Sequence, residues 1–281
     1  MIELINKFIS NKDKETISSI TNYNFNELIN SVNNWGEYKN NKKHVVSKLD
    51  IKGMHLLRCI LAERIINYKR KKIGNPIYKE YLDFEEKGII LINNFNPKKD
   101  YEKYKILLRY IVGNSNLNPS TPTSKREDSF GYDIQHTMHV DTFHSSIKVF
   151  KYGNKVKKDN GPFSYVLGSH KNTIGKLKIL YGLSCRRSEG ILNQELTREK
   201  NHEKWTDSFR LDLGKNNIIS EEKINNNLNS YGLNSEFLIE GEKDTLIITD
   251  TSGFHRKYPC KQGFKRITNR LAISRDNPFS I

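Results

Sequence analysis

The 281-residue sequence has few cysteines and no long hydrophobic run, and both shortages exclude classes of protein. Its three cysteines, Cys59, Cys185 and Cys260, are odd in number, lie far apart and form no CxxC pair. We therefore expect reduced thiols, with neither a disulfide framework nor a cysteine-based metal knuckle. No run of roughly 18 apolar residues occurs, so no membrane-spanning helix is expected.

The N-terminal region lacks the features of a secretory signal. The first 15 residues, MIELINKFISNKDKE, contain no basic start followed by an apolar stretch and a small-residue cleavage site. This composition predicts a cytoplasmic protein.

Acidic residues are also scarce relative to basic ones. Lys and Arg number 47 against 32 Asp and Glu, which gives a formal net charge of +15 at pH 7. Such a charge is compatible with nucleic-acid binding. However, the Lys- and Asn-rich runs are typical of an AT-rich genome, and phosphate and base recognition favour Arg. We do not expect nucleic acid as the main partner, because a surface that attracts a small anionic substrate explains the charge equally well.

The N-terminal part of the chain is predicted to be mostly helical. Apolar residues recur with the 3.6-residue period of an amphipathic helix over residues 50–72, and the basic YKRKK suits its C-terminus. A buried strand is predicted within 87–97, and a helix over 99–114 that stops at Gly113. The Pro-, Thr- and Ser-rich residues 115–130 are predicted to be a loop of the kind that forms lids or binding loops.

From about residue 129 onward, short strand-like segments alternate with turns. They are DIQHTMHVD, SSIKVFKY, GPFSYVLGS, SEFLIEG, DTLIITD and KRITNRLAISR. This pattern predicts a mainly β fold with helical decoration, built on a sandwich or jelly roll. We expect a helical N-terminal extension, residues 1–84, packed on a domain of residues 85–281 with a polar insertion at about 171–230.

A histidine and an aspartate lie two residues apart in the HVDTFHSS segment. In an extended chain His139 and Asp141 point to the same face, whereas His136 and His144 point to the other. Two histidines and one carboxylate on one triangular face form the oxygen-reactive type of non-haem Fe(II) site. His255, which follows the apolar strand DTLIITD, is the leading candidate for the second histidine.

The last strand-like segment carries two arginines. Arg266, Thr268 and Arg270 alternate along it and share one face. A guanidinium inside a β fold is costly unless it meets a carboxylate, which it can bind through two parallel hydrogen bonds. A dicarboxylate co-substrate would satisfy both features, with one end on the metal and the other on an arginine, to which the Thr268 hydroxyl adds a hydrogen bond.

Three segments together resemble the phytanoyl-CoA dioxygenase family of Fe(II)- and 2-oxoglutarate-dependent oxygenases. They are MHVDTFHSSIKVFKY, DNGPFSYVLGSHK and TLIITDTSGFHRKYPCKQGFKR, and the resemblance covers roughly residues 85–275. It implies a double-stranded β-helix in which His139, Asp141 and His255 bind Fe(II). It also implies that Arg266, 11 residues after His255, binds the distal carboxylate of 2-oxoglutarate. Arg270, 15 residues after His255, is the alternative, because that spacing is similar to other oxygenases of the wider superfamily.

The activity that this resemblance implies is hydroxylation by O2, with release of succinate and CO2. The presence of Asp141 favours hydroxylation over halogenation, since halogenases of this family carry a small residue there. The substrate stays open as a small or lipid-like molecule, and the positive charge favours an anionic one. Two alternatives are a catalytically silent basic β-sandwich that binds anionic partners, and a cupin-like metalloenzyme without 2-oxoglutarate. The second alternative predicts that Arg266 and Arg270 point away from the metal.

Overall fold

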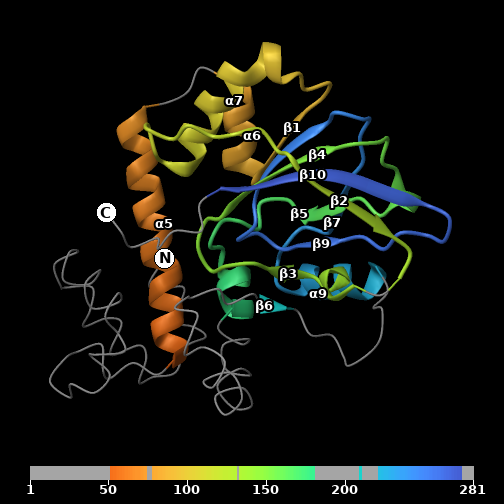
Figure 1. Cartoon of the computed structure of the whole chain (residues 1–281). Coiled ribbons are helices and arrows are strands. Elements are labelled where there is room, and N and C mark those ends of the chain that lie inside the picture. Colours follow the sequence, from red (N-terminus) through yellow and green to blue (C-terminus); the bar gives the residue numbers. More distant parts are fainter. Residues whose placement is uncertain (1–50, 75–77, 132, 181–208, 211–220, 274–281) are drawn as a thin grey trace, which may run out of the picture.

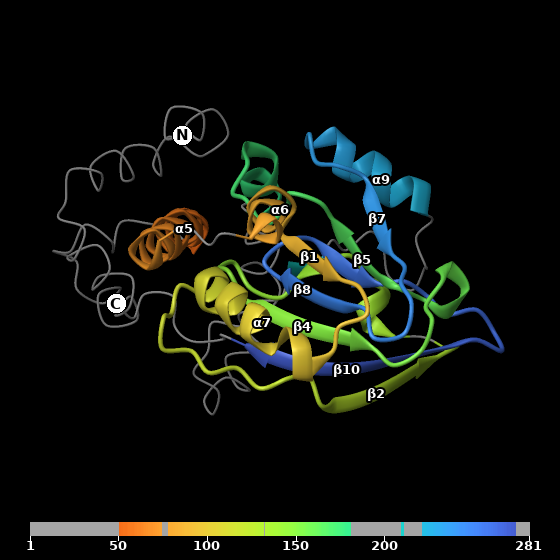
Figure 2. The same cartoon turned by 90° about the horizontal axis from the view of Figure 1, so that it is seen from above.

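The structure is a computed structural model that describes residues 51–74, 78–131, 133–180, 209–210 and 221–273. Two antiparallel sheets form its centre, with helices α5 (Ile51–Ile73), α6 (Lys79–Lys87) and α7 (Pro97–Val112) on one side and α9 (Glu221–Ser230) beside strand β7 of the second sheet (Figures 1 and 2). The first sheet runs in the order β1 (Ile89–Ile92), β8 (Leu246–Asp250), β4 (Ile147–Tyr152), β10 (Lys265–Ile273), β2 (Ser124–Ser129). The second runs in the order β6 (Phe209–Arg210), β3 (His139–Val140), β9 (His255–Lys257), β5 (Phe163–Val166), β7 (Glu236–Ile239).

The order in which the chain visits the two sheets identifies the fold. Strands β2, β3, β4 and β5 alternate between the two sheets along the chain. Strands β7, β8, β9 and β10 alternate in the same way. Eight strands that wind between two sheets in this way form a jelly roll. The predicted fold class, mainly β with helical decoration around a jelly roll, is therefore confirmed.

Helices α6 and α7 pack on the outer face of the first sheet. The other described helices are α5, which contacts α7, and α9, which contacts β7 of the second sheet, together with residues 174–180. The Asn96 side chain caps α7 by accepting from the Lys98 backbone N–H, and Gly113 ends the helix at φ 70°. Both ends agree with the helix predicted over 99–114. Among the described residues, no helix is both long and apolar enough to span a lipid bilayer.

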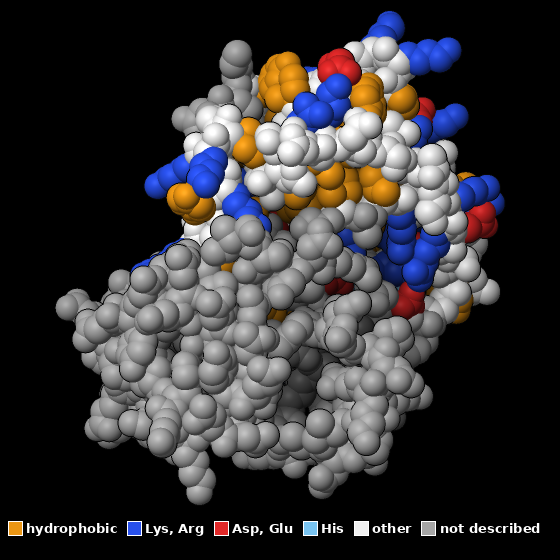
Figure 3. All heavy atoms as spheres, turned by 60° about the vertical axis from the view of Figure 1, so that its left-hand side comes forward, with side chains coloured by type: hydrophobic (Ala, Val, Ile, Leu, Met, Phe, Trp, Pro, Cys, Tyr) orange, Lys and Arg blue, Asp and Glu red, His pale blue; other side chains and the backbone are white. Residues whose placement is uncertain are grey.

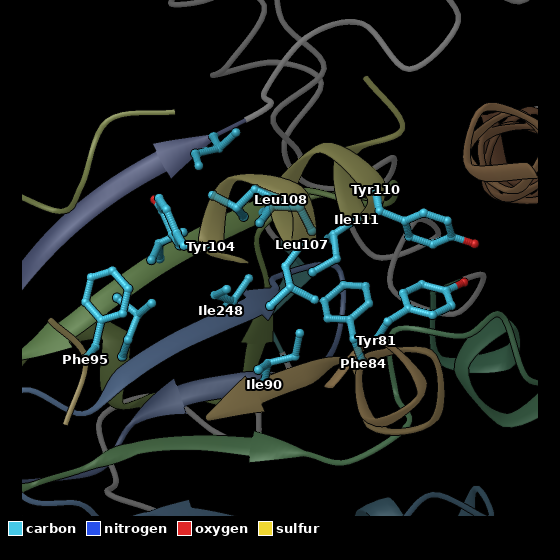
Figure 4. Packing of buried hydrophobic residues seen from close by; sticks show 14 residues of the cluster. Tyr81, Phe84, Ile90, Phe95, Tyr104, Leu107, Leu108, Tyr110, Ile111 and Ile248 are labelled. Atoms are coloured by element: carbon cyan, nitrogen blue, oxygen red, sulfur yellow. The ribbon is translucent and has the colours of Figure 1, made fainter. Parts of the chain in front are cut away.

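The main hydrophobic core lies between helices α6 and α7 and the first sheet. Figure 4 shows Leu107, Leu108 and Ile111 of α7 beside Phe84 of α6, with Ile248 of β8 close to them. All five side chains are buried, and burial of each contributes about 1.5–3 kcal/mol to stability. A second cluster of buried residues includes Tyr152, Phe163, Tyr165 and Ile247.

The alternation of side chains along β4 decides which residues face the interior. Ile147 and Val149 pack in the core under the helices, whereas Tyr152 belongs to the second cluster and Phe150 packs against it. Side chains two residues apart share a face of a strand, so Lys148 shares the face of Phe150 and Tyr152.

Two parts of the chain differ from the sequence prediction. Residues 124–129, predicted as part of a loop, form strand β2, which pairs with β10 from Lys265↔Ser129 to Arg270↔Ser124. The insertion at about 171–230, predicted without a clear strand, contributes the short strand β6. Its residues 181–208 and 211–220 lie outside the described residues, as do residues 1–50. Helix α6 runs across the predicted boundary between residues 84 and 85, and the division into two parts stays a prediction.

Candidate metal centre

Two adjacent strands of the second sheet bring the predicted histidines together. His139 on β3 and His255 on β9 are direct partners in the antiparallel ladder, although 116 positions separate them in the sequence. Directly opposed residues of neighbouring strands project to the same face. Their ring centroids are accordingly 4.4 Å apart, and both side chains are buried.

The carboxylate of Asp141 completes the cluster. Asp141 follows the end of β3, and its backbone N–H donates to Thr251 O at 2.9 Å, which ties it to the turn before β9. Its Oδ1 lies 3.8 Å from His139 Nε2, and its Oδ2 lies 3.6 Å from His255 Nε2. One ligand atom from each of the three residues lies within 4.8 Å of the others. The three side chains that the sequence singled out therefore converge in space.

Backbone carbonyl groups orient both imidazole rings. His139 Nδ1 lies 2.7 Å from Thr137 O, and His255 Nδ1 lies 2.9 Å from Gly253 O. A carbonyl oxygen only accepts, so each Nδ1 carries the proton and each Nε2 is the nitrogen with a lone pair. Metal-binding histidines have this type of support from the other ring nitrogen. Two lone-pair nitrogens and one carboxylate match the donor set of a ferrous site with open positions.

The surroundings of the cluster keep the Asp141 carboxylate ionised and the His255 imidazole neutral. Burial alone would raise the pKa of Asp141, but His255 and the Lys148 ammonium outweigh it and hold that pKa below its ordinary value. Burial lowers the pKa of His255, and this effect outweighs the opposing attraction of Asp141. Lys148 forms an ion pair with Asp141 Oδ2. The Asp141 carboxylate and the His255 imidazole are thus in the protonation states that metal binding requires.

The two histidines share a cavity of about 190 Å³ with the residues proposed to bind a co-substrate. Arg266, Thr268 and Arg270 of β10 all line it. The cupin-like alternative predicts that both arginines point away from the metal site, and a cavity shared with the two histidines favours the 2-oxoglutarate-dependent alternative instead.

The arginines already meet a carboxylate of the protein itself. Asp128, from β2, is buried and lies 2.9 Å from Arg266 Nη2 and 3.5 Å from Arg270 Nη2. Arg266 also donates to Gly161 O, and Arg270 Nε donates to the Thr268 hydroxyl at 3.3 Å. The sequence argument that these arginines need an external carboxylate is therefore incomplete, because Asp128 meets part of that need.

The balance of charge nevertheless leaves the cavity positive. Six cationic side chains line it: Arg126, Lys148, Arg256, Lys257, Arg266 and Arg270. Four carboxylates form ion pairs with these six: Asp128, Asp133, Asp141 and Glu236. Two positive charges thus remain before the charge of any metal ion is counted. Repulsion from this excess contributes to the lowered pKa of Arg270, about 10, for which burial is the largest cause.

The sequence analysis missed Lys148, which lines this cavity, and Asp128, which pairs with the cavity's two arginines on β10. The alternation of side chains along β4 could have identified Lys148. The aromatic residues Phe150 and Tyr152 follow it at every second position, so all three side chains share one face of the strand. For Asp128 the signal is weaker, because its polar segment does not look like a strand. The remaining histidines near the motif, His136 and His144, are buried but do not belong to the cluster.

The basic surface bears on the alternative of a module that binds anionic partners. On the face seen in Figure 3, Lys and Arg side chains lie in separate groups with hydrophobic and uncharged atoms between them. On the described part of this face the basic side chains therefore form several groups rather than one stripe.

Comparison with known proteins gives remote structural matches. No protein-family model matches the sequence, and no curated protein matches it. The chain resembles HygX from Streptomyces hygroscopicus with iron bound, at 10% identity and a TM-score of 0.35 over 70% of this chain and 86% of that one. It also resembles HygX with nickel and 2-oxoglutarate bound (11%, TM-score 0.32, 70% and 87%) and EctD from S. alaskensis with bound Fe (11%, TM-score 0.35, 71% and 77%). With TM-scores below 0.5, these matches do not bear on what this chain binds.

Proposed function

We propose that the protein is an Fe(II)- and 2-oxoglutarate-dependent oxygenase of the phytanoyl-CoA dioxygenase type. It would hydroxylate a small or lipid-like, anionic substrate with O2 and release succinate and CO2. One observation carries the proposal: a His-Asp-His cluster with the donor set of a ferrous site opens into a cavity with two uncompensated positive charges. A dianionic co-substrate that also binds the metal satisfies both halves of this arrangement.

His139, Asp141 and His255 would hold the ferrous ion. When bound, the ion and 2-oxoglutarate supply the oxidising chemistry that places one oxygen atom of O2 into a C–H bond. The chain contributes the orientation of the ligands. Thr137 O and Gly253 O fix the two rings, so that each Nε2 lone pair faces the carboxylate side of the cluster.

The other end of the co-substrate would bind on β10. Arg266 with Thr268 is the proposed pair, because Arg266 is almost fully buried in the same cavity and its Nε has no hydrogen-bond partner among the described residues. Arg270 is the second candidate. Its hydrogen bonds to Thr268 and Asp128 are long, at 3.3 and 3.5 Å, and 31% of its side chain is exposed, so it can turn toward a ligand more easily.

Aromatic side chains exclude water around these charges. Phe150, Tyr152 and Phe163 line the cavity, and the Arg270 guanidinium lies 5.7 Å from the ring centroid of Phe150. A lower local dielectric strengthens the attraction between the cations and a bound dicarboxylate. Binding of the co-substrate should therefore be tight only when its negative charge matches the two uncompensated positive charges of the cavity.

The test is calorimetric titration of 2-oxoglutarate into the full chain under anaerobic conditions, with and without Fe(II). We expect binding with Fe(II), weaker or no binding without it, and no binding in a His139→Ala, His255→Ala double variant. A screen of small and lipid-like anions for stimulated succinate release in air then identifies the substrate class. Wild-type affinity for 2-oxoglutarate in the double variant would overturn the proposal.

A further inference from the structure

A second cavity has a volume of about 170 Å³. None of His139, Asp141 and His255 lines it. Its walls come from α5, α6 and the turns that follow β3, β5 and β8. The residues on which the argument depends are Glu63, Arg70, Glu85, His170, Lys171 and Asn172.

Three buried polar atoms on its walls have no hydrogen-bond partner among the described residues. They are Arg70 Nη2, His170 Nδ1 and Asn172 Oδ1. Arg70 is only 6% exposed, so its Nη2 cannot rely on bulk water. Buried polar groups are nearly always paired, and a buried orphan therefore indicates a missing partner.

The same side chains are otherwise held in place. Arg70 donates from Nε to Ile111 O at 2.9 Å and from Nη1 to Glu85 at 3.2 Å. Asn172 donates from Nδ2 to Cys59 O at 2.9 Å. Each side chain is thus held by its other atoms, which leaves one donor of Arg70 and one acceptor of Asn172 unpaired on two residues that line the cavity. The volume of this cavity, about 170 Å³, is far larger than the roughly 10–15 Å³ that a single water molecule needs.

The charged side chains around this cavity have no positive excess, unlike those around the metal site. Arg70 and Lys171 line it together with the carboxylates Glu63, Glu85 and Asp250. Behind the wall, the buried Lys176 donates to His170 O at 3.0 Å, and burial lowers the pKa of its ammonium group. Burial lowers the pKa of His170 to about 4, so its imidazole is neutral at pH 7. An anion finds no excess of positive charge here.

We propose that this second cavity binds a neutral, polyhydroxylated small molecule. A hydroxyl group both donates and accepts, so one such molecule can meet the Arg70 donor and the Asn172 acceptor at once. The inference goes beyond the proposed function, and it needs neither iron nor 2-oxoglutarate.

The position of the cavity connects its occupant with the metal centre. Phe143, His144 and Ser145, which begin two residues after Asp141, line it, and so does Ser252, three residues before His255. A bound molecule would therefore touch both turns that carry metal ligands.

The test is saturation-transfer NMR on the full chain without added iron, with D-glucose as the neutral probe and D-gluconate as its anionic counterpart. We expect glucose to bind and gluconate to bind at least several-fold more weakly. Asn172→Ala should weaken glucose binding about fivefold, the effect of one lost hydrogen bond. Asn67→Trp, on an exposed position of the cavity wall, should block binding without removing any buried contact.

Arg64→Trp is the matched control, because Arg64 is also exposed on α5 but does not line the cavity. Thermal unfolding of each variant verifies that it folds. If Asn172→Ala does not fold, Asn67→Trp still tests the proposal. Absence of glucose binding to the wild type would mean that the cavity holds only water, and would overturn the proposal. Glucose binding that survives Asn67→Trp, or gluconate that binds more tightly than glucose, would overturn it as well.

Discussion

Lys148 and Asp141 form an ion pair within the His-Asp-His cluster. The Asp141 carboxylate thus has a cationic partner in addition to the two imidazoles that it faces. A metal ion and the Lys148 ammonium would compete for the same oxygen, while the ammonium also adds to the positive charge of the cavity. Lys148 should therefore act in opposite directions on the two ligands of the proposed function.

Replacing Lys148 by Met should strengthen metal binding and weaken co-substrate binding. We expect affinity for Mn(II), used as an oxygen-stable substitute for Fe(II), to rise about tenfold, and affinity for 2-oxoglutarate to fall by a similar factor, each about 1.4 kcal/mol. Anaerobic calorimetry measures both. Lys151→Met is the control, since Lys151 lies on the same strand and pairs with Asp244 at 2.9 Å. Affinities that both stay at the wild-type level would contradict the role given to Lys148.

Substitution of the two arginines should identify which one binds 2-oxoglutarate. Because a hydrogen bond to a charged group is worth about 1.5–3 kcal/mol, Arg266→Gln should weaken 2-oxoglutarate binding at least tenfold, and Arg270→Gln much less. Arg126→Gln is a suitable control, because Arg126 lines the same cavity and pairs with the same Asp128. The reverse ranking would assign the role to Arg270.

Asp128 should be important for stability although it is not a ligand. Its side chain is 2% exposed and pairs with Arg126, Lys257, Arg266 and Arg270. Asp128→Asn leaves buried cations uncompensated and should lower the free energy of unfolding by about 3–5 kcal/mol. Urea unfolding measures it. The exposed partner of Lys151 gives the comparison: Asp244→Asn should cost less than about 1 kcal/mol. Equal effects of the two substitutions would exclude a special role for Asp128.

The same carboxylate should make stability depend on pH in the acid range. Burial alone would raise the pKa of Asp128, but Lys257 and Arg266 hold it below the 3.8 of an unperturbed carboxyl. A folded pKa below the unfolded one gives stability that is fully present above about pH 4 and is lost as pH falls through the folded value. Unfolding of the wild type between pH 6 and pH 2 should show this loss, and Asp128→Asn should show less of it. Identical pH profiles would contradict the assignment.

Close packing at Gly253 should control the orientation of His255. A Cβ atom there would overlap the Tyr165 hydroxyl, which donates to Asp250 O at 2.8 Å. Gly253→Ala should therefore cost about 1–3 kcal/mol of stability and weaken metal binding, because Gly253 O orients the His255 ring. Adding Tyr165→Phe should recover part of both losses. Additive losses in the double variant would show that the two residues are not coupled.

Sequence patterns were sufficient for the fold and for the convergence of the metal ligands. Apolar runs bounded by turns predicted the segments that form β1, β4, β5, β7, β8 and β10. Strand β2 was missed because it is a polar edge strand, buried at only one of its six positions, so no apolar pattern marks it. The expectation that Asp141 lies in the same strand as His139 was only partly correct, since β3 ends at Val140 and a hydrogen bond to Thr251 positions Asp141 instead.

The electrostatic environment of the site was harder to predict. Long-range pairs such as Asp128 with Arg266 depend on strand register, which a single sequence does not fix when one partner strand is polar. Cys185, one of the three cysteines, lies outside the described residues. The location in the cytoplasm and the division into two parts remain predictions.

Equilibrium dialysis with Fe(II) under anaerobic conditions is the most direct measurement of the metal site. The wild-type chain should bind one ferrous ion, and the His139→Ala, His255→Ala double variant should bind none. A double variant of the neighbouring histidines, His136→Ala with His144→Ala, should keep the wild-type stoichiometry, since neither residue belongs to the cluster. Equal binding of Fe(II) by the wild type and the His139, His255 double variant would contradict the metal centre on which the proposed function depends.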